Sequence, residues 1–180
     1  MLARYSDAAV AKDRHLVWSV QPVVPSAVLP PQVMWPHLQL QSPPPVDIVV
    51  QHVRQLAAAA GSGGESASSK EFDGHENASG LLLDRWSYPD PPTQVVQSIY
   101  AFLQDHWEQL SLEVKQELRN TALVPIAHRM VRASRLFFRL LDDLSPFMFE
   151  VPRAYGAYDK LFQELGTQAS PSPQDYSLFL

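Results

Sequence analysis

Histidines and paired carboxylates are the side chains of this sequence that most readily do chemistry, as metal ligands or as acids and bases. The strongest local grouping is His106 with Asp105 and Glu108 on one predicted helix, and ordinary surface polarity accounts for it. No HExxH motif or comparable ligand spacing occurs. The six histidines are scattered along the chain: His15, His37, His52, His75, His106 and His128. The sequence therefore predicts no metal site.

Asp142 and Asp143 are adjacent carboxylates that could share a proton or bind a cation. They follow a segment predicted to be helical, so a solvated helix end is the simpler interpretation. The glycines at 61–64 lack the lysine, preceding strand and following helix of a phosphate-binding loop, and there is no GxSxG elbow. We expect no catalysis and no cofactor. A small enzyme using Asp142, Asp143 or a histidine is the third hypothesis for function.

The bulk composition limits the classes of partner. The 180 residues carry a formal net charge of −5, contain no cysteine and show no run of Lys or Arg. A nucleic-acid surface or an anionic membrane surface would leave a basic footprint, and none is present. No segment has the apolar length of a signal peptide or a membrane span. We expect a protein of the cytoplasm or nucleus, without disulfides.

The element that organises the chain is the densely patterned stretch 122–166. Two short apolar runs, 122–127 and 130–133, predict two strands joined by a tight turn. Ser134 is expected to cap a helix whose apolar face would carry Leu136, Phe137, Leu140, Leu141 and Leu144. Pro152 is expected to open a last helix that ends at Gly166.

The remaining elements follow from periodicity and capping residues. Spacing predicts helices after Ser42, after Asp90 and after Ser111, and an extended segment over 30–36 anchored by Met34 and Trp35. Leu38 and Leu40 alternate with glutamines, which favours a brief strand. The short run 16–20 fits a helix or a strand.

The fold class expected is α+β, predominantly helical, with helices around a short two-stranded β element near 122–133. The expected organisation is an N-terminal part over 1–56, a flexible low-complexity insertion over 57–80, a core over 81–166 and the start of a helix over 167–180. Ser172 to Asp175 form a capping box at the head of that last helix. Because the helix is cut short at Leu180, we expect a piece of a longer protein.

The run LVPIAHRMVRASRLFFRLLDDLSPFMFEVPRAYGAYDKLFQELG resembles a segment of the sacsin family of giant chaperone-like proteins. The match is carried by residues 123–125, 144–147, 149–152, Tyr155 and 165–166. Upstream, Val17-Trp18-Ser19, Pro30-Pro31, Trp35 and residues 38–44 are similar to the plant and algal branch. In the turn at 127–129, this chain has Ala-His-Arg where family members often carry a glycine.

This resemblance implies a part of the sacsin repeat region that lies outside its ATPase-like head. None of the head's nucleotide-binding motifs is present in the sequence, so ATP binding by that mechanism is not expected. The implied work is structural: contacts with other segments of the same large protein, or with client and co-chaperone proteins.

The leading hypothesis is thus a non-catalytic module of a sacsin-like protein-quality-control scaffold. The alternative is a free-standing adaptor that binds partners through an exposed aromatic surface. No catalytic, cofactor or metal residues are assigned. The candidate contact and packing residues are Trp35, Pro125, Phe137, Pro146, Phe147, Phe149, Pro152 and Tyr155.

Overall fold

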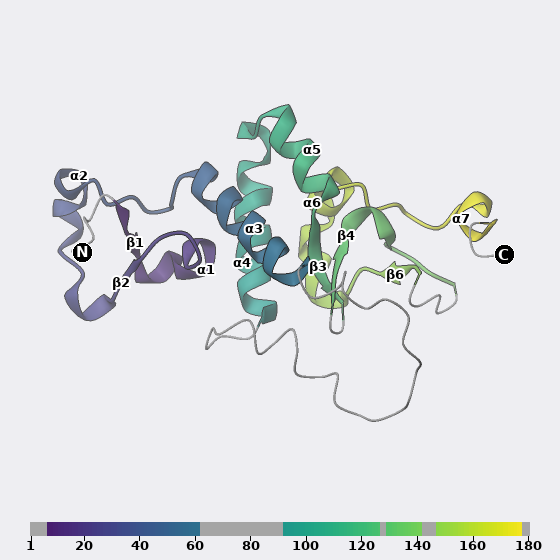
Figure 1. The fold of residues 1–180 in the computed structure, drawn as a ribbon, viewed down its shortest axis with the longest axis horizontal. Coiled ribbons are helices and arrows are strands. Elements are labelled where there is room, and N and C mark those ends of the chain that lie inside the picture. The colour runs from purple at the N-terminus through teal and green to yellow at the C-terminus, as the bar shows by residue number, and fades with distance from the viewer. Residues whose placement is uncertain (1–6, 62–91, 127–128, 142–146, 178–180) are drawn as a thin grey trace, which may run out of the picture.

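The computed structural model describes residues 7–61, 92–126, 129–141 and 147–177, in an α+β arrangement that is predominantly helical. The described strands form three separate two-stranded pairs. The N-terminal elements lie at one end of the molecule, and the long helices α3 (Val46–Gly61) and α4 (Pro92–His106) lie at its centre (Figure 1). The pair of strands β3 (Ala122–Ile126) and β4 (Arg129–Arg132) and the helix α6 (Asp159–Glu164) lie beside them (Figure 1). The short helix α7 lies at the opposite end (Figure 1). The expected fold class is confirmed.

Helices α3 (Val46–Gly61) and α4 (Pro92–His106) form the centre of the core, as their apolar periodicity predicts. The predicted face of α3 is buried at Val49, Val50, Val53 and Leu56. α3 continues to Gly61, so the insertion expected from residue 57 cannot begin there, because the alanines at 57–60 are good helix formers. Residues 62–80 of that insertion, and the proposed cap Asp90, lie outside the described residues.

The predicted apolar face of α4 is also buried, but its last residue, Trp107, lies just beyond the end of the helix. Trp107 belongs to the short 3-10 helix η5 (Trp107–Gln109) and is almost fully covered. The buried residues of α4 itself are Val95, Val96, Ile99, Tyr100, Phe102 and Leu103.

The N-terminal segment attaches to these helices through α1 (Arg14–Val17), which contacts both α3 and α4. Strands β1 (Ala9–Val10) and β2 (Val23–Val24) pair in parallel on one side of it. The run 16–20 thus begins helically, with Leu16 and Val17 buried.

The expectation of extended backbone over 30–36 is wrong. The chain forms η3 (Ser26–Val28), η4 (Gln32–Met34) and α2 (Trp35–Leu38). Proline fixes φ near the helical value at the start of a helix, so Pro36 here supports a helix instead of an extended segment. Met34 is exposed, so it is not the core anchor that the sequence predicts. The strand expected at 38–41 is absent, because Leu38 ends α2 and Gln39 adopts a left-handed conformation with φ of 56°.

Helix α5 (Leu112–Asn120) begins where the sequence predicts, since the Ser111 hydroxyl accepts a hydrogen bond from the Val114 amide at 3.3 Å. The two strands that follow are β3 (Ala122–Ile126) and β4 (Arg129–Arg132), and they pair antiparallel as predicted. The register shifts at Leu123, which makes a β-bulge there. The turn at 127–128 lies outside the described residues.

The helix expected after Ser134 is wrong. A single 3-10 turn, η6 (Ala133–Arg135), leads into strand β5 (Leu136–Phe137), which pairs in parallel with β6 (Phe149–Glu150). The Phe138 and Arg139 amides donate to the carbonyls of Gln168 and Ala169 at 2.9 and 3.1 Å, instead of to carbonyls one helical turn back. Pairing with a distant segment thus overrides the local helical spacing. Leu144 lies outside the described residues.

The helix expected after Pro152 forms in two parts, the 3-10 helix η7 (Arg153–Tyr158) and α6 (Asp159–Glu164). It ends as predicted at Gly166, whose φ of 100° suits glycine. The Gly166 amide donates to Gln163 and the Thr167 amide to Phe162, the paired bonds of a Schellman cap. In α7 (Pro173–Ser177), the predicted capping box is present, with the Ser172 amide donating to Asp175 at 2.7 Å.

Candidate interaction site

The candidate contact residues divide into packed and exposed side chains. Phe137, Phe149 and Tyr155 are buried, and they stabilise the fold instead of offering a surface. Among the described large apolar residues that are exposed, Phe147 is the one aromatic, with half of its surface (50%) accessible. Trp35, Pro125 and Pro152 are half-buried, and Pro146 lies outside the described residues.

Phe147 is held next to the β5–β6 pair by fixed backbone contacts. Arg135 donates from Nη2 to the Phe147 carbonyl oxygen at 2.9 Å. Two residues later, β6 pairs Phe149 with Leu136, and the Val151 amide donates to Phe137 at 2.9 Å. An aromatic ring on an ordered backbone loses little conformational freedom when a partner covers it. We call Phe147, with its supporting Arg135 and β5–β6, the Phe147 site.

A second exposed apolar side chain, Leu141 (92% accessible), follows β5 in the chain. Leu141 and Phe147 therefore flank residues 142–146, which lie outside the described residues and include Asp142 and Asp143. Leu141 and Phe147 are both exposed apolar side chains that a protein partner could cover.

An aromatic cluster holds this region to the rest of the molecule. The buried Tyr100 ring on α4 meets the rings of Tyr155, Tyr158 and Phe162 edge-on, at centroid distances of 5.3, 5.6 and 5.3 Å. Burial raises the pKa of Tyr100 well above its usual range, and burial likewise raises the pKa of Tyr155. Both phenols therefore stay neutral and serve packing.

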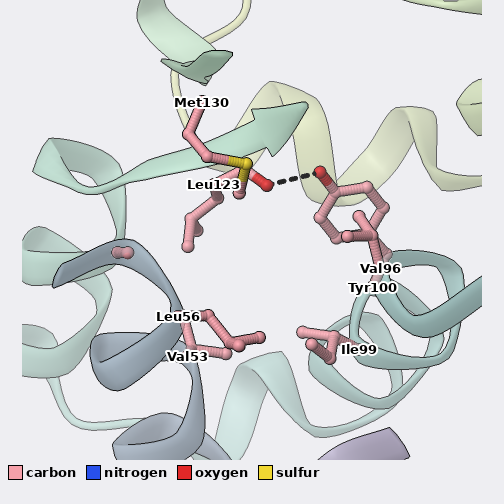
Figure 2. A pocket seen from close by; sticks show the side chains of 8 residues that line it. Val53, Leu56, Val96, Ile99, Tyr100, Leu123 and Met130 are labelled. Carbon is pink, nitrogen blue, oxygen red and sulfur yellow. Dashed lines mark hydrogen bonds between the residues drawn. The ribbon is translucent and has the colours of Figure 1, made fainter. Parts of the chain in front are cut away.

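The Tyr100 hydroxyl has a specific partner in the hairpin. It donates to the Leu123 carbonyl at 2.8 Å, and Leu123 is the residue at which the β3–β4 register shifts (Figure 2). A carbonyl displaced from a ladder in a buried site needs another donor, because leaving it unpaired is costly. Tyr100 thus compensates the bulge and fixes β3 on α4.

Figure 2 also shows a small cavity between α3, α4 and the hairpin, lined by Val53, Leu56, Val96, Ile99, Leu123 and Met130 among others. Its volume is about 20 Å³ and its lining is almost wholly apolar. That is room for about one water molecule, which would find too few polar partners. The cavity is a packing gap and not a ligand site.

His52, one of the six histidines, forms with Ser19 a pair that has the chemistry of a catalytic dyad. The Ser19 hydroxyl lies 2.6 Å from Nδ1 of His52, and His52 Nε2 lies 3.2 Å from the carbonyl of His15. A carbonyl accepts only, so Nε2 carries the proton, and Nδ1 accepts from the serine.

The surroundings of His52 indicate that the Ser19–His52 pair stabilises the fold and does not take part in catalysis. His52 is fully buried (0% accessible), its ring meets Trp18 edge-on at 5.4 Å, and burial lowers its pKa from 6.5 to about 4. Ser19 and His52 do not line the small cavity between α3, α4 and the hairpin. The dyad ties the segment after α1 to α3.

Among the described histidines, His106 has partners of its own on α4. His106 donates from Nδ1 to the Phe102 carbonyl at 2.9 Å and stacks on the Phe102 ring, so its ring serves packing on its own helix. In the described part of the chain, no three His, Asp or Glu side chains are arranged to hold a metal ion. His75, His128, Asp142 and Asp143 lie outside the described residues.

Sequence reasoning named Phe147 but missed its support, Arg135. An exposed arginine after a strand carries no signal that it will cap a carbonyl twelve positions away. The dyad was also missed, because Ser19 and His52 are far apart in sequence.

Comparison with known proteins returns no match to any protein-family model, curated protein or solved structure. None of the helices in the described ranges combines the length and apolar character needed to cross a membrane.

Proposed function

We propose that this chain is a non-catalytic module of a sacsin-like protein-quality-control scaffold, which contacts clients, co-chaperones or other segments of the same large protein in the cytoplasm or nucleus. The proposal rests first on the sequence resemblance over 123–166. The observation that carries it further is the Phe147 site, an exposed aromatic ring on a backbone held by Arg135.

Most of the candidate aromatic residues between 137 and 155 are buried, which supports a scaffold module over an adaptor that binds through an aromatic surface. Phe137, Phe149 and Tyr155 are buried, so they build the module. Phe147 and Leu141 are exposed and so are available to contact a partner, and they lie on either side of residues 142–146 in the sequence. A holding chaperone needs such limited apolar contact points on a stable support, because a wide apolar surface would make the module itself aggregate.

Suppression of aggregation tests this function. Citrate synthase would be heated with increasing amounts of the chain, and light scattering followed with and without ATP. We expect scattering to fall with the chain present, to the same extent in both cases. The variants Phe147→Ser and Leu141→Ser should lose most of this effect.

Leu112→Ser is the matched control, because Leu112 is a 75% exposed leucine at the start of α5, away from the Phe147 site. It should protect the client like the unaltered chain. Absence of protection, or an equal loss in Leu112→Ser, would refute the proposal.

A further inference from the structure

A groove of about 260 Å³ lies between the end of α4, η5 and α6, on residues that the proposed function does not use. Its floor is apolar and is formed by Trp107 and Leu161, which are otherwise buried. Its rim is polar and consists of Gln104, Glu108, Lys160, Gln163 and Glu164. A pocket with an apolar floor and a few polar groups holds a ligand in one orientation, because each polar group needs a matching partner.

The charges around the rim leave one cation over. Glu164 accepts from Arg119, whose Nη2 lies 3.3 Å from one carboxylate oxygen and whose Nε donates to the Glu164 carbonyl at 2.6 Å. Glu108 lies 3.8 Å from the Lys115 ammonium. Each rim carboxylate thus has a basic neighbour, whereas Lys160 makes no ion pair with the described residues. The groove therefore complements an anionic group, and a carboxylate is the anion that a polypeptide supplies.

Gln104 adds a requirement for a hydrogen-bond donor. Its Oε1 is buried and accepts no hydrogen bond within the described part of the chain. A buried acceptor without a donor lowers stability, and such groups are rare in folded proteins. The terminal torsion of a glutamine side chain is broad, so a small turn of the amide brings Oε1 toward the groove that Gln104 lines. A ligand N–H in the groove would then satisfy this oxygen.

We propose that the groove binds the C-terminal residue of another polypeptide, where that residue has an apolar side chain. One such residue meets all three requirements. Its carboxylate pairs with the Lys160 ammonium, its backbone N–H donates to Gln104 Oε1, and its side chain lies on Trp107 and Leu161. An Asp or Glu within a chain brings a carboxylate but no apolar side chain beside it. This inference does not rest on the proposed function, whose aggregation test uses the Phe147 site.

Titration of the full chain with N-acetyl-leucine tests the inference, followed by NMR through the Trp107 indole N–H signal. We expect a saturable shift. N-acetyl-leucinamide has the same shape without the charge and should bind about tenfold more weakly, the ratio expected when a charge-assisted hydrogen bond is lost. Two further probes should also bind more weakly, because 4-methylpentanoate lacks the N–H and N-acetylglycine lacks the apolar side chain.

Variants assign each contact to its residue. Lys160→Gln should weaken binding of N-acetyl-leucine about tenfold and remove its advantage over the amide. Lys12→Gln is the matched control, because Lys12 is an exposed lysine of the 3-10 helix η2 (Ala11–Asp13) and does not line the groove. It should bind like the unaltered chain. Gln104→Leu should remove the advantage of N-acetyl-leucine over 4-methylpentanoate, while the protein melts no lower because an unpaired buried oxygen is gone.

A glycine–serine peptide that ends in leucine tests the polypeptide source. Its free acid should bind at least as tightly as N-acetyl-leucine, and weaker binding would overturn the assignment to a polypeptide in favour of a free small carboxylic acid. The absence of a saturable shift, equal binding of N-acetyl-leucine and its amide, or undiminished binding by Lys160→Gln would refute the carboxylate site.

Discussion

At the scale of single residues, His52 couples the fold to pH. It accepts from Ser19 and donates to His15 only in its neutral form, and burial lowers its pKa from 6.5 to about 4. In the unfolded chain the same imidazole has an ordinary pKa of about 6.5. Between these two values the unfolded state binds a proton that the folded state excludes, so acid favours unfolding.

The free energy of unfolding should therefore be constant above pH 6.5 as far as His52 is concerned, and fall by about 3 kcal/mol as the pH drops to 4. Urea denaturation across this range measures the loss, and NMR titration of the His52 ring checks the pKa directly. His52→Leu should show a smaller decline over the same interval, whatever its absolute stability. An NMR pKa near 6.5 would contradict the prediction.

Carboxylates contribute a separate acid dependence. Hydrogen bonds from Arg54 lower the pKa of Glu117, in a bidentate pair at 2.6 and 2.7 Å that joins α3 to α5. This stabilisation is present above the ordinary Glu pKa and is lost as the pH falls through the lowered value. Because both side chains are substantially exposed, the pair contributes little, and the His52 decline should dominate above pH 5.

At the scale of elements, the β3–β4 hairpin depends on a bond from α4. The Leu123 carbonyl at the bulge is bound by the Tyr100 hydroxyl at 2.8 Å. Tyr100→Phe keeps the ring contacts but leaves this carbonyl unpaired, so we expect a loss of about 1–2 kcal/mol in the free energy of unfolding. Chemical denaturation monitored by circular dichroism measures it.

Tyr158→Phe is the matched control, because the Tyr158 ring packs on Tyr100 and no hydrogen bond of its hydroxyl is seen in the described structure. It should cost less than about 0.5 kcal/mol, as surface substitutions commonly do. Equal losses in the two variants would show that the bulge needs no donor from α4.

The elements that sequence predicted are those whose signals are local. The stripes of α3 and α4, the Ser111 cap and the two apolar runs at 122–127 and 130–133 each specify a structure within a few residues. The prediction of a helix after Ser134 was wrong because the backbone of this segment hydrogen-bonds to Gln168 and Ala169, some thirty residues away. The candidate site follows the same division. Phe147 was named from its aromatic type, whereas the hydrogen bond from Arg135 to the Phe147 carbonyl forms only in the folded chain.

At the scale of the whole molecule, one contiguous core runs from Ala9 to Leu165 and joins the N-terminal elements to the Phe147 region through α4. The described residues beyond Ala169, 170–177, contribute no member to this core. Cooperative unfolding follows the shared core, so both ends of α4 should melt in one transition.

Two changes of the chain test this arrangement. Deleting residues 171–180 removes α7 and should leave the melting midpoint unchanged, because the Thr167 hydroxyl bond to the Ala133 carbonyl at 3.0 Å and the Gln168 pairing with β5 are retained.

Val17→Ala, at a fully buried position of α1, should lower the free energy of unfolding by about 2 kcal/mol, because apolar burial is lost and a cavity is left behind. Circular dichroism and tryptophan fluorescence should record the same midpoint in each case. If Val17→Ala instead gave separate transitions for the two signals, the N-terminal elements would be an independent unit, and α4 would not carry stability between them and the Phe147 site.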